Sequence, residues 1–551
     1  MHPNAGVSAA PTGFRVDIRR FPWINRIASD LAFDAGRLSP FFAGDWRDPD
    51  AWRAAIGRAQ AHARNRAALT ALLQAQQAGR GAPVAATAAA QRLGDPTAVA
   101  VVTGQQAGLF GGPLYTVLKA LTAIRLADEV REKYDVPAVP VFWVDAEDHD
   151  WAEVNQCGVL DANGVCRTVV IEDEPPPGGY SVARVRLGAS IDQAIDALAA
   201  ALPATEFTAD LLASLKAAYQ PGRGMADAFA RWLETLLGPR GLVVYDASDP
   251  AAKPLAAGVF VREIETATET SRQAADAGKA LEARGYHAQV SPQPDTTALF
   301  WTRDGRLPIR LADDGRLTAN GIVETRPALA EKARRQPQEF SPNVVLRPVV
   351  QDAIFPTVCY VGGPSEVAYL AQLRGVYESF GIPMPLVYLR ASATVVDSNA
   401  GRFIGRGDVP FEALQPRDEA ALNALLEAAL PHEVEAAVSD VQHVLEQRME
   451  VLARAVIAVD ATLEGAARST LGRMQDDVKK LQGKILQAAK RKDDTLRRQF
   501  TNAQSQAFPG GVPQERVISL VSFLNKYGPA VVDRLAEGIS LEPGVHTILT
   551  P

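Results

Sequence analysis

The same order of elements occurs twice in this sequence, and the repetition limits the folds that the chain can adopt. In each copy an apolar run is followed by a Gly-Gly-Pro turn, a helix-like segment and a second apolar run. The copies span 98–144 and 357–389. Proline suits the first turn of a helix, because the N–H that it lacks would have no partner there. Two strand–helix–strand units of this kind predict a parallel sheet with right-handed crossovers.

The expected fold class is therefore α/β, with a Rossmann-like parallel-sheet core, inserted connecting domains and a long α-helical coiled coil. A chain of 551 residues is too long for one hydrophobic core, so we expect several units. Asp304-Gly305 and Asp314-Gly315 are turn signals that predict a small antiparallel meander at about 286–325. The predicted segments are an N-terminal part of the core at 1–150, an inserted connecting region at 151–240, a continuation of the core with the meander at 241–410, the coiled coil at 411–505 and a C-terminal helical segment at 506–551.

The segment from about 415 to 505 differs from the rest of the chain, because glycine and proline nearly vanish from it. Apolar residues recur there at alternating spacings of four and three, from 445 to 466 and, after a one-residue phase shift, from Leu471 to Ala488. This is the heptad pattern of a coiled coil. The seam can be buried in an antiparallel hairpin within one chain or by a second copy, and we expect a homodimer.

Composition excludes several functional classes. The net charge of -7 gives no reason to expect a nucleic-acid partner. No apolar run approaches the roughly 18 residues of a membrane span, and the N-terminus lacks the basic and apolar regions of a signal peptide. Cys157, Cys166 and Cys359 lack CxxC spacing, so neither a disulfide scaffold nor a zinc ribbon is indicated. We therefore expect a cytoplasmic protein without a nucleic-acid or membrane partner.

An acidic cluster directly follows the second apolar run of the first unit. It consists of Asp145, Glu147, Asp148, His149 and Asp150. In open α/β sheets ligands bind at the carboxyl ends of the strands, where this cluster would lie. Neighbouring carboxylates raise each other's pKa, and such a group is tolerated where a cation, a metal or a catalytic proton relieves the repulsion. We predict an active site here, with Glu147, Asp148, His149 and Asp150 as catalytic residues.

The chemistry of this cluster leaves alternatives open. On an extended strand, Glu147 and His149 would point to one side and Asp148 and Asp150 to the other. Glu147 and His149 could then act as a base and its orienting partner, or as two metal ligands. A solvated loop that caps the next element is the structural alternative. Because no cysteine or second histidine follows at ligand spacing, we do not expect a metal.

The glycine-rich turn of the first unit, 103–112, is a second candidate site. Backbone N–H groups in such a turn, ahead of a helix, favour an anion, whereas the structural alternative is a tight turn that needs positive φ. The turn matches neither GxGxxG nor the Walker A sequence. Lys119, about two helical turns further on, is expected at the surface. The predicted substrate-binding residues in and beside the first unit are Thr103, Gly104, Gln105, Gln106, Gly112, Tyr115 and Trp143.

The second unit and the segment before it contain further polar candidates. Arg347 lies in an apolar, proline-bounded stretch and could pair a substrate carboxylate bidentately. The alternative is an internal salt bridge to Asp352. Glu366 follows the second Gly-Gly turn, where it could also serve only to favour the helix dipole. The predicted substrate-binding residues here are Asn343, Arg347, Gln351, Gly362, Gly363, Glu366 and Arg390.

Together these segments resemble the cysteine ligases that catalyse the last, cysteine-adding step of bacillithiol biosynthesis. The matching segments are 103–120, 139–155, 340–352, 360–373 and 509–528, which reach from the core to the C-terminus. The resemblance implies a Rossmann-like core with connecting insertions and a coiled-coil arm that supports homodimers. It also implies a reaction in which cysteine acylates the amino group of glucosaminyl malate.

The resemblance further implies roles for the candidate residues. The glycine-rich loop would hold phosphate or carboxylate, while Glu147, Asp148 and His149 would bind the amine and assist its deprotonation. Arg347 and Glu366 would hold charged ends of the substrates. The family's core is similar to that of class I nucleotidyltransferases and synthetases, so the cofactor is unknown but could be ATP or another adenine nucleotide. The HxGH and KMSKS signatures of those enzymes do not occur in this chain.

Two other functions remain alternatives at this point. One is a nucleotidyl or sugar-nucleotide transferase that would use the same turns to bind an anion. The other is a non-catalytic, ligand-binding coiled-coil scaffold. We predict the ligase, with cysteine and the amino-sugar malate as its small-molecule partners.

Overall fold

The computed structural model describes residues 12–148, 150–172, 181–303, 305–416, 418–428, 432–492 and 494–551. The chain forms two compact units, which are Met1–Val395 with Pro513–Pro551, and Val396–Val512. The chain therefore leaves the first unit, forms the second and returns to the first. The second unit begins and ends at other residues than the predicted 411 and 505, because Val395 and Gln514 are hydrogen-bonded to each other within the first unit.

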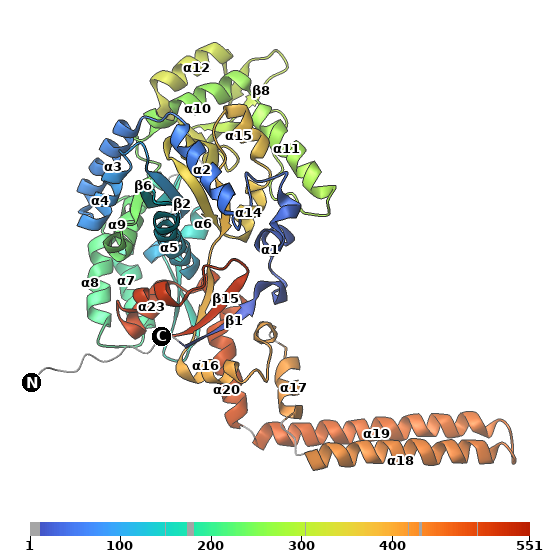
Figure 1. The fold of residues 1–551 in the computed structure, drawn as a ribbon. Helices are drawn as coiled ribbons and strands as arrows, with labels where there is room; N and C mark the ends of the chain where they lie inside the picture. Colours follow the sequence, from blue (N-terminus) through green and yellow to red (C-terminus); the bar gives the residue numbers. More distant parts are fainter. Residues whose placement is uncertain are drawn as a thin grey trace, which may run out of the picture. The chain divides into compact units, whose positions relative to one another are not determined.

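The core of the first unit is a five-stranded sheet in which all neighbouring strands are parallel. Its order is β13-β12-β2-β3-β6, so strands from the two predicted repeat units are neighbours at its centre (Figure 1). The strands are β2 (Val99–Gln106), β3 (Ala138–Asp145), β6 (Val243–Asp246), β12 (Thr357–Gly362) and β13 (Leu386–Leu389). Their apolar runs are almost entirely buried, as is typical of parallel strands covered on both faces. The predicted α/β class with a Rossmann-like sheet is confirmed.

Helices follow both Gly-Gly-Pro turns, as predicted. The first is α5 (Leu114–Tyr134), which begins directly after Pro113. The second predicted helix is divided into α14 (Pro364–Leu370) and α15 (Arg374–Phe380). Because α5 is buried along most of its length, any charged side chain in its first turns lies inside the protein.

The region at 151–240, predicted as an insertion, packs onto the core. It contains an antiparallel hairpin of β4 (Gln156–Leu160) and β5 (Cys166–Val170), followed by α7 (Ser190–Ala201), α8 (Thr208–Ala218) and α9 (Met225–Leu237). Buried residues of these elements share one hydrophobic cluster with α5 and β3. The region therefore contributes to the main core, although it interrupts the succession of core strands.

The predicted meander is part of a larger antiparallel sheet. Its order is β10-β9-β8-β7-β11. The strands are β7 (Thr296–Trp301), β8 (Leu307–Leu311), β9 (Leu317–Ala319), β10 (Ile322–Glu324) and β11 (Phe340–Pro342). Gly315, between β8 and β9, has a φ of 80°, which is the backbone conformation that the Asp-Gly turn signal indicates.

A third sheet joins the two ends of the first unit. Strand β15 (Val545–Thr550) pairs antiparallel with β1 (Thr12–Asp17) and parallel with β14 (Ser392–Val395). The segment 506–551 was predicted to be helical, and this is correct only for α21 (Gln514–Val517), α22 (Leu520–Tyr527) and α23 (Val531–Gly538). The sequence VHTILT of β15 is rich in β-branched residues, which favour a strand.

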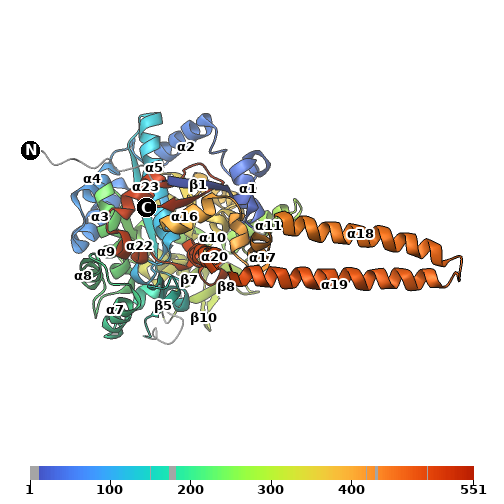
Figure 2. The same cartoon turned by 90° about the horizontal axis from the view of Figure 1, so that it is seen from below.

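The second unit contains the long helices that the heptad pattern predicts. They are α18 (His432–Val456) and α19 (Leu463–Lys492), which lie side by side in both views (Figures 1 and 2). The sequence left open an antiparallel hairpin within one chain, and the structure contains it, because the chain reverses between Val456 and Leu463 inside the pattern from 445 to 466. Asp460 accepts hydrogen bonds from the N–H and hydroxyl of Thr462, both at 2.8 Å, and so forms the turn.

Shorter helices complete the second unit. They are α16 (Ser398–Gly405), α17 (Ala420–Ala428) and α20 (Asp494–Ala507). Several large apolar side chains of α18 and α19 are exposed, among them Leu452 and Leu481. Within the part of the chain that the structure describes, no helix combines the length and the apolar character that a membrane span requires.

Candidate active site

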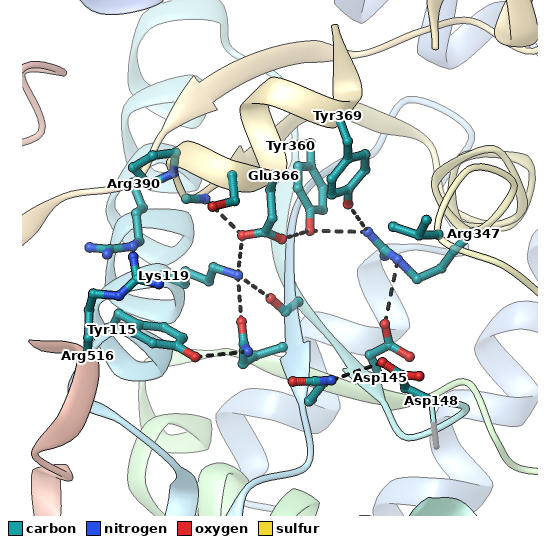
Figure 3. Close-up of a pocket in the computed structure, with 17 residues that line it drawn as sticks. Tyr115, Lys119, Asp145, Asp148, Arg347, Tyr360, Glu366, Tyr369, Arg390 and Arg516 are labelled. Carbon is teal, nitrogen blue, oxygen red and sulfur yellow. Dashed lines mark hydrogen bonds and ion pairs between the residues drawn. The ribbon is translucent and has the colours of Figure 1, made fainter. Parts of the chain in front are cut away.

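A cavity of about 300 Å³ lies where β2, β3 and β12 end at the carboxyl edge of the central sheet (Figure 3). This is the edge at which open α/β sheets bind ligands. The predicted residues that line the cavity are Gly104, Gln105, Gln106, Tyr115, Asp148, Arg347, Gly363, Glu366 and Arg390. The other lining residues are Lys119, Asp145, Val344, Tyr360, Pro364, Ser365, Tyr369 and Arg516. The structure therefore brings the two repeat units together around one site.

Several predicted residues support the cavity from behind. The Thr103 hydroxyl donates to the carbonyl of Val361 at 2.8 Å and ties β2 to β12. The carbonyl of Gly362 accepts a hydrogen bond of 2.9 Å from the backbone N–H of Arg390. Trp143 of β3 packs against the next strand, with its ring centre 4.9 Å from that of Tyr245. None of these predicted side chains lines the cavity.

Asn343 and Gln351 do not line the cavity but hydrogen-bond to residues near it or in it. Oδ1 of Asn343 accepts from the N–H groups of Val345 and Leu346 at 2.9 and 3.1 Å, just before α13 (Arg347–Ile354) begins. Oε1 of Gln351 accepts from Nη1 of Arg347 at 3.3 Å. Both residues therefore position Arg347.

The glycine-rich turn is divided, because Gly104, Gln105 and Gln106 line the cavity and its second half does not. Leu109, Phe110, Gly111 and Gly112 are buried and do not line the cavity. The N–H groups of Gly111 and Gly112 donate within the turn. At the start of α5, the N–H of Leu114 donates to Ile518 at 2.8 Å. The positive φ of 69° at Gly112 supports the alternative interpretation, a tight turn that glycine tolerates.

The acidic cluster is divided between different environments. Asp145 and Asp148 line the cavity, whereas Glu147 forms a buried ion pair with Lys253 at the start of α10 (Lys253–Thr266). Asp150 is exposed and does not line the cavity. The predicted alternation of sides fails, because β3 ends at Asp145 and the residues after it are not extended strand. His149 lies outside the described residues.

Burial favours a proton or a cation at two of these carboxylates. It raises the pKa of Asp145, against the lowering effect of Arg347. It also raises the pKa of Glu147, against the effect of Lys253. Among the described residues, no three His, Cys, Asp or Glu side chains gather in a way that could hold a metal ion. Asp145, which lines the cavity, is therefore placed to take up a proton or to meet a cation.

Lys119 was expected at the surface, and this prediction is wrong. Its side chain is buried, and Nζ donates to the carbonyl of Gly104 and to Oε1 of Gln105, both at 2.8 Å. Nζ also forms an ion pair with Glu366. Burial lowers the pKa of Lys119, whereas Glu366 opposes this shift. The apolar residues on all sides of α5 were the available signal, because a helix that is apolar all round is buried.

Glu366 has both of the roles that the sequence left open. Oε2 accepts from the N–H of Gly363 at 2.8 Å, which caps α14, and the same oxygen pairs with Lys119. Oε1 accepts from the hydroxyl of Tyr360 at 2.7 Å. Although burial alone would raise the pKa of Glu366, Lys119 and these hydrogen bonds lower it. The carboxylate is therefore ionised and held in place beside the cavity.

Arg347 faces the cavity and pairs with Asp145, not with Asp352. Its Nε lies 3.7 Å from Oδ2 of Asp145, and Nη2 donates to the hydroxyl of Tyr369 at 2.7 Å. The predicted alternative partner, Asp352, instead accepts from the Tyr377 hydroxyl at 2.5 Å. At 3.7 Å the pairing with Asp145 is too long for a hydrogen bond, so Asp145 keeps accepting capacity toward the cavity.

Arg390 is held by a residue from a distant part of the chain. Its Nη1 and Nη2 donate to the two carboxylate oxygens of Glu515 at 3.1 and 2.7 Å. Its guanidinium lies 5.6 Å from the centre of the Tyr115 ring. Arg516, the next residue of α21, lines the cavity on the same side (Figure 3). A basic side of the cavity, with Arg390 and Arg516, thus faces an acidic side with Asp145 and Asp148.

Two family models match the chain in succession. One is described as the N-terminal Rossmann-like domain of bacillithiol biosynthesis BshC and matches residues 16–391. The other is described as the C-terminal coiled-coil domain of the same family and matches residues 393–551. The chain belongs to the BshC family. The resemblance that the sequence segments indicated is confirmed.

BshC relatives align with nearly the whole chain. The relatives of Salinibacter ruber and Symbiobacterium thermophilum are 36% and 33% identical to it. The alignments cover 94% and 93% of this chain and 95% of each relative. A relative from Chlorobaculum tepidum is 34% identical over 81% of this chain and 82% of its own length. All three carry the name "Putative cysteine ligase BshC".

The cavity combines residues from both BshC domains. Most lining residues belong to the Rossmann-like match, but Arg516 belongs to the coiled-coil match. Glu515, which holds Arg390, belongs to the coiled-coil match too. The sequence reasoning assigned no role to these two residues or to Tyr360 and Tyr369. Their only signal was their position inside segments 509–528 and 360–373, which carry the family resemblance.

Proposed function

We propose that this chain is a cysteine ligase, which joins the carboxyl group of cysteine to the amino group of glucosaminyl malate in an amide bond. The observation that carries the proposal is the opposition of charges across the cavity, with Asp145 and Asp148 facing Arg390 and Arg516 (Figure 3). Glucosaminyl malate has an ammonium group on its sugar and carboxylates on its malate. Such a molecule complements both sides of the cavity at once.

The acidic side is suited to prepare the amine for attack. An amine attacks a carbonyl only after it has lost its proton, so the site needs a base as well as a cation-binding group. The raised pKa of Asp145 makes it the better proton acceptor, whereas Asp148 is held by Gln106, whose Nε2 donates to Oδ2 at 3.1 Å. We assign ammonium binding to both carboxylates and proton acceptance to Asp145.

The carboxyl group of cysteine also needs activation, because a free carboxylate does not form an amide with an amine. We propose ATP or another adenine nucleotide as the activating co-substrate. Gly111 and Gly112 at the end of the glycine-rich turn are buried and their N–H groups donate within the turn, which argues against these two residues as a phosphate site. The roles of the chain's own residues proposed above do not depend on where the nucleotide binds.

The test is to incubate the protein with glucosaminyl malate and cysteine, with and without ATP and a divalent metal, and to measure the new thiol by mass spectrometry. We expect the product only when both substrates and the nucleotide are present. Asp148→Asn should lower kcat/KM about 10- to 100-fold, mainly through a higher KM for the amine. Asp192→Asn, an exposed carboxylate of α7, serves as the matched control and should leave turnover unchanged.

Two results would contradict the proposal. Pyrophosphate release from a nucleoside triphosphate without any need for cysteine would favour a nucleotidyl or sugar-nucleotide transferase. Folded protein that forms no thiol, consumes no nucleotide and binds none of these ligands would favour a non-catalytic scaffold.

We propose in addition that the protein acts as a homodimer in the cytoplasm. The exposed apolar side chains of α18 and α19, such as Leu452 and Leu481, support association through the second unit, because heptad seams are normally buried. The cysteines Cys157, Cys166 and Cys359 are free thiols, which fits a reducing compartment.

A further inference from the structure

The cations that line the cavity differ in how their charge is balanced. Three of them have a carboxylate partner, and these pairs are Lys119 with Glu366, Arg347 with Asp145 and Arg390 with Glu515. The guanidinium of Arg516 has no carboxylate partner among the described residues. Arg516 is exposed and lines the cavity, so its positive charge faces the space that a ligand would occupy.

The backbone around Arg516 is nevertheless held firmly. On one side, Gln514 exchanges two hydrogen bonds with the backbone of Val395, at 2.8 and 2.6 Å. On the other side, the carbonyl of Ile518 accepts from Leu114 at 2.8 Å. The N–H of Ser519 donates to Gly158, also at 2.8 Å. The fixed backbone therefore places the start of the Arg516 side chain beside the cavity, and its charge remains available to a ligand.

Tyr115 offers a second unused donor on the same side. Lys119 donates to Oε1 of Gln105 at 2.8 Å, and an ammonium can only donate. The other end of this amide, Nε2, must therefore be the donor to the Tyr115 hydroxyl, at 3.2 Å. The hydroxyl oxygen thus accepts from the protein, while its own hydrogen has no acceptor among the described residues. That hydrogen is available to a ligand in the cavity.

Glu515 fixes the orientation of Arg390 beside Arg516 and Tyr115. Its carboxylate accepts from Arg390 and also from the Ser392 hydroxyl and the N–H of Ala393, both at 3.0 Å. This saturated carboxylate neutralises Arg390 and fixes its orientation against the Tyr115 ring. The two adjacent residues of α21 therefore have opposite effects, because Glu515 removes positive charge from the cavity and Arg516 adds it.

We propose that Arg516 and Tyr115 form the subsite for a carboxylate of the substrate. In this proposal Glu515 is a positioning residue, which neutralises Arg390 so that Arg516 supplies the net positive charge on this side of the cavity. The guanidinium fork and a phenol hydroxyl donate to carboxylate oxygens. This inference rests on the proposed function and names the residues that select the acidic end of the amino-sugar substrate. The carboxylate of the malate group is the ligand of this subsite, while the ammonium lies toward Asp145 and Asp148.

The test compares two amino sugars by isothermal titration with the full-length protein, and it needs no turnover. Glucosaminyl malate carries the carboxylates, whereas methyl glucosaminide has the same amine without them. Arg516→Gln should weaken binding of glucosaminyl malate about 10- to 100-fold and leave methyl glucosaminide unchanged. Tyr115→Phe should weaken it less, by about 3- to 10-fold. Arg534→Gln, an exposed arginine of α23, is the matched control and should change neither affinity.

The affinity of Glu515→Gln for free L-malate distinguishes the proposed role of Glu515 from a purely structural one. Removal of this carboxylate leaves the charge of Arg390 unbalanced, so free L-malate should bind more tightly, by about 3- to 10-fold at low salt. Arg516→Gln should weaken binding of the same anion. Thermal unfolding of each variant shows whether it is folded. If Glu515→Gln does not fold, the selective loss of affinity for glucosaminyl malate in Arg516→Gln and Tyr115→Phe still decides the question.

The inference and the proposed function can fail separately. If Arg516→Gln weakens the binding of both amino sugars equally, or of neither, the proposed subsite is wrong even if the protein forms the thiol. Selective loss of glucosaminyl malate without any thiol formation would retain the subsite and reject the ligase. A weaker affinity for L-malate in folded Glu515→Gln would contradict the role assigned to Glu515.

Discussion

At the scale of single residues, Lys119 shows how one buried charge organises the site. Its ammonium has three donors, and they reach Gly104, Gln105 and Glu366. A buried charge is tolerated only when such partners replace water. Because the same three partners line the cavity, their positions depend on an amino group to which the sequence analysis gave no role.

We expect Lys119→Met to cost about 1 to 3 kcal/mol of stability, because it leaves the half-buried carboxylate of Glu366 without its partner. The free energy of unfolding in urea measures this cost. The double variant with Glu366→Gln should recover much of it, since the unpaired charge is then gone, but should remain inactive. A single variant as stable as the unmodified protein would contradict the importance of this ion pair.

The candidate residues themselves were only partly predictable. Residues at the ends of strands, such as Gln105, Asp148 and Gly363, could be located because the strand pattern places those ends at one edge of the sheet. The burial of Lys119 had a signal in its apolar helix, but its partner Glu366 lies on another element and could not be located. Glu147 could not be placed either, because the direction of a side chain after a strand end has no periodic signal. Arg516 lies 126 residues beyond Arg390 in the chain, so nothing local connects the two.

At the scale of elements, the position of α21 depends on a close backbone contact with β4. The N–H of Ser519 donates to Gly158, and a Cβ at Gly158 would overlap the carbonyl of Val517. Glycine is therefore required in β4 for a neighbouring segment to approach. Because Arg516 directly precedes Val517, this contact also sets the place of the proposed carboxylate subsite.

Gly158→Ala should displace the segment around Val517, with a cost in stability of about 1 to 3 kcal/mol and a loss of affinity for glucosaminyl malate. Titration calorimetry and urea unfolding measure the two effects. Gly57→Ala is the control, because a Cβ there meets no atom within 4 Å and helical alanine stabilises by about 0.5 to 1 kcal/mol. If Gly158→Ala binds glucosaminyl malate with unchanged affinity, this contact does not set the position of the subsite.

Elements that follow a strong local pattern were predicted well. The two strand–helix–strand units and the two long helices have such patterns, and the structure contains them. The turn between α18 and α19 was missed, because the heptad spacing continues through it. Strand β15 was missed because its partners, β1 and β14, are far away in sequence.

At the scale of the whole molecule, we expect assembly to depend on the second unit. Leu452 and Leu481 are exposed by 48% and 56% in the single chain. Such residues in a heptad pattern are normally covered by another helix. The first unit has its own buried core and sheet.

Replacement of both Leu452 and Leu481 by glutamate should convert a dimer into a monomer, because burial of two charges at a helix interface is unfavourable. Light scattering of the full-length protein, at several concentrations, measures the change. Val84→Glu is the control, since Val84 is exposed by 83% in the first unit. A variant that remains a dimer would place the interface elsewhere.

The hydrogen bonds between Val395 and Gln514 have a consequence for folding during synthesis. The ribosome must deliver the whole of Val396–Val512 before Glu515 and Arg516 exist. Closure of so long a loop also costs chain entropy. A nascent chain can therefore form its parallel sheet early, whereas the carboxylate subsite that we propose is completed only after synthesis has passed the second unit.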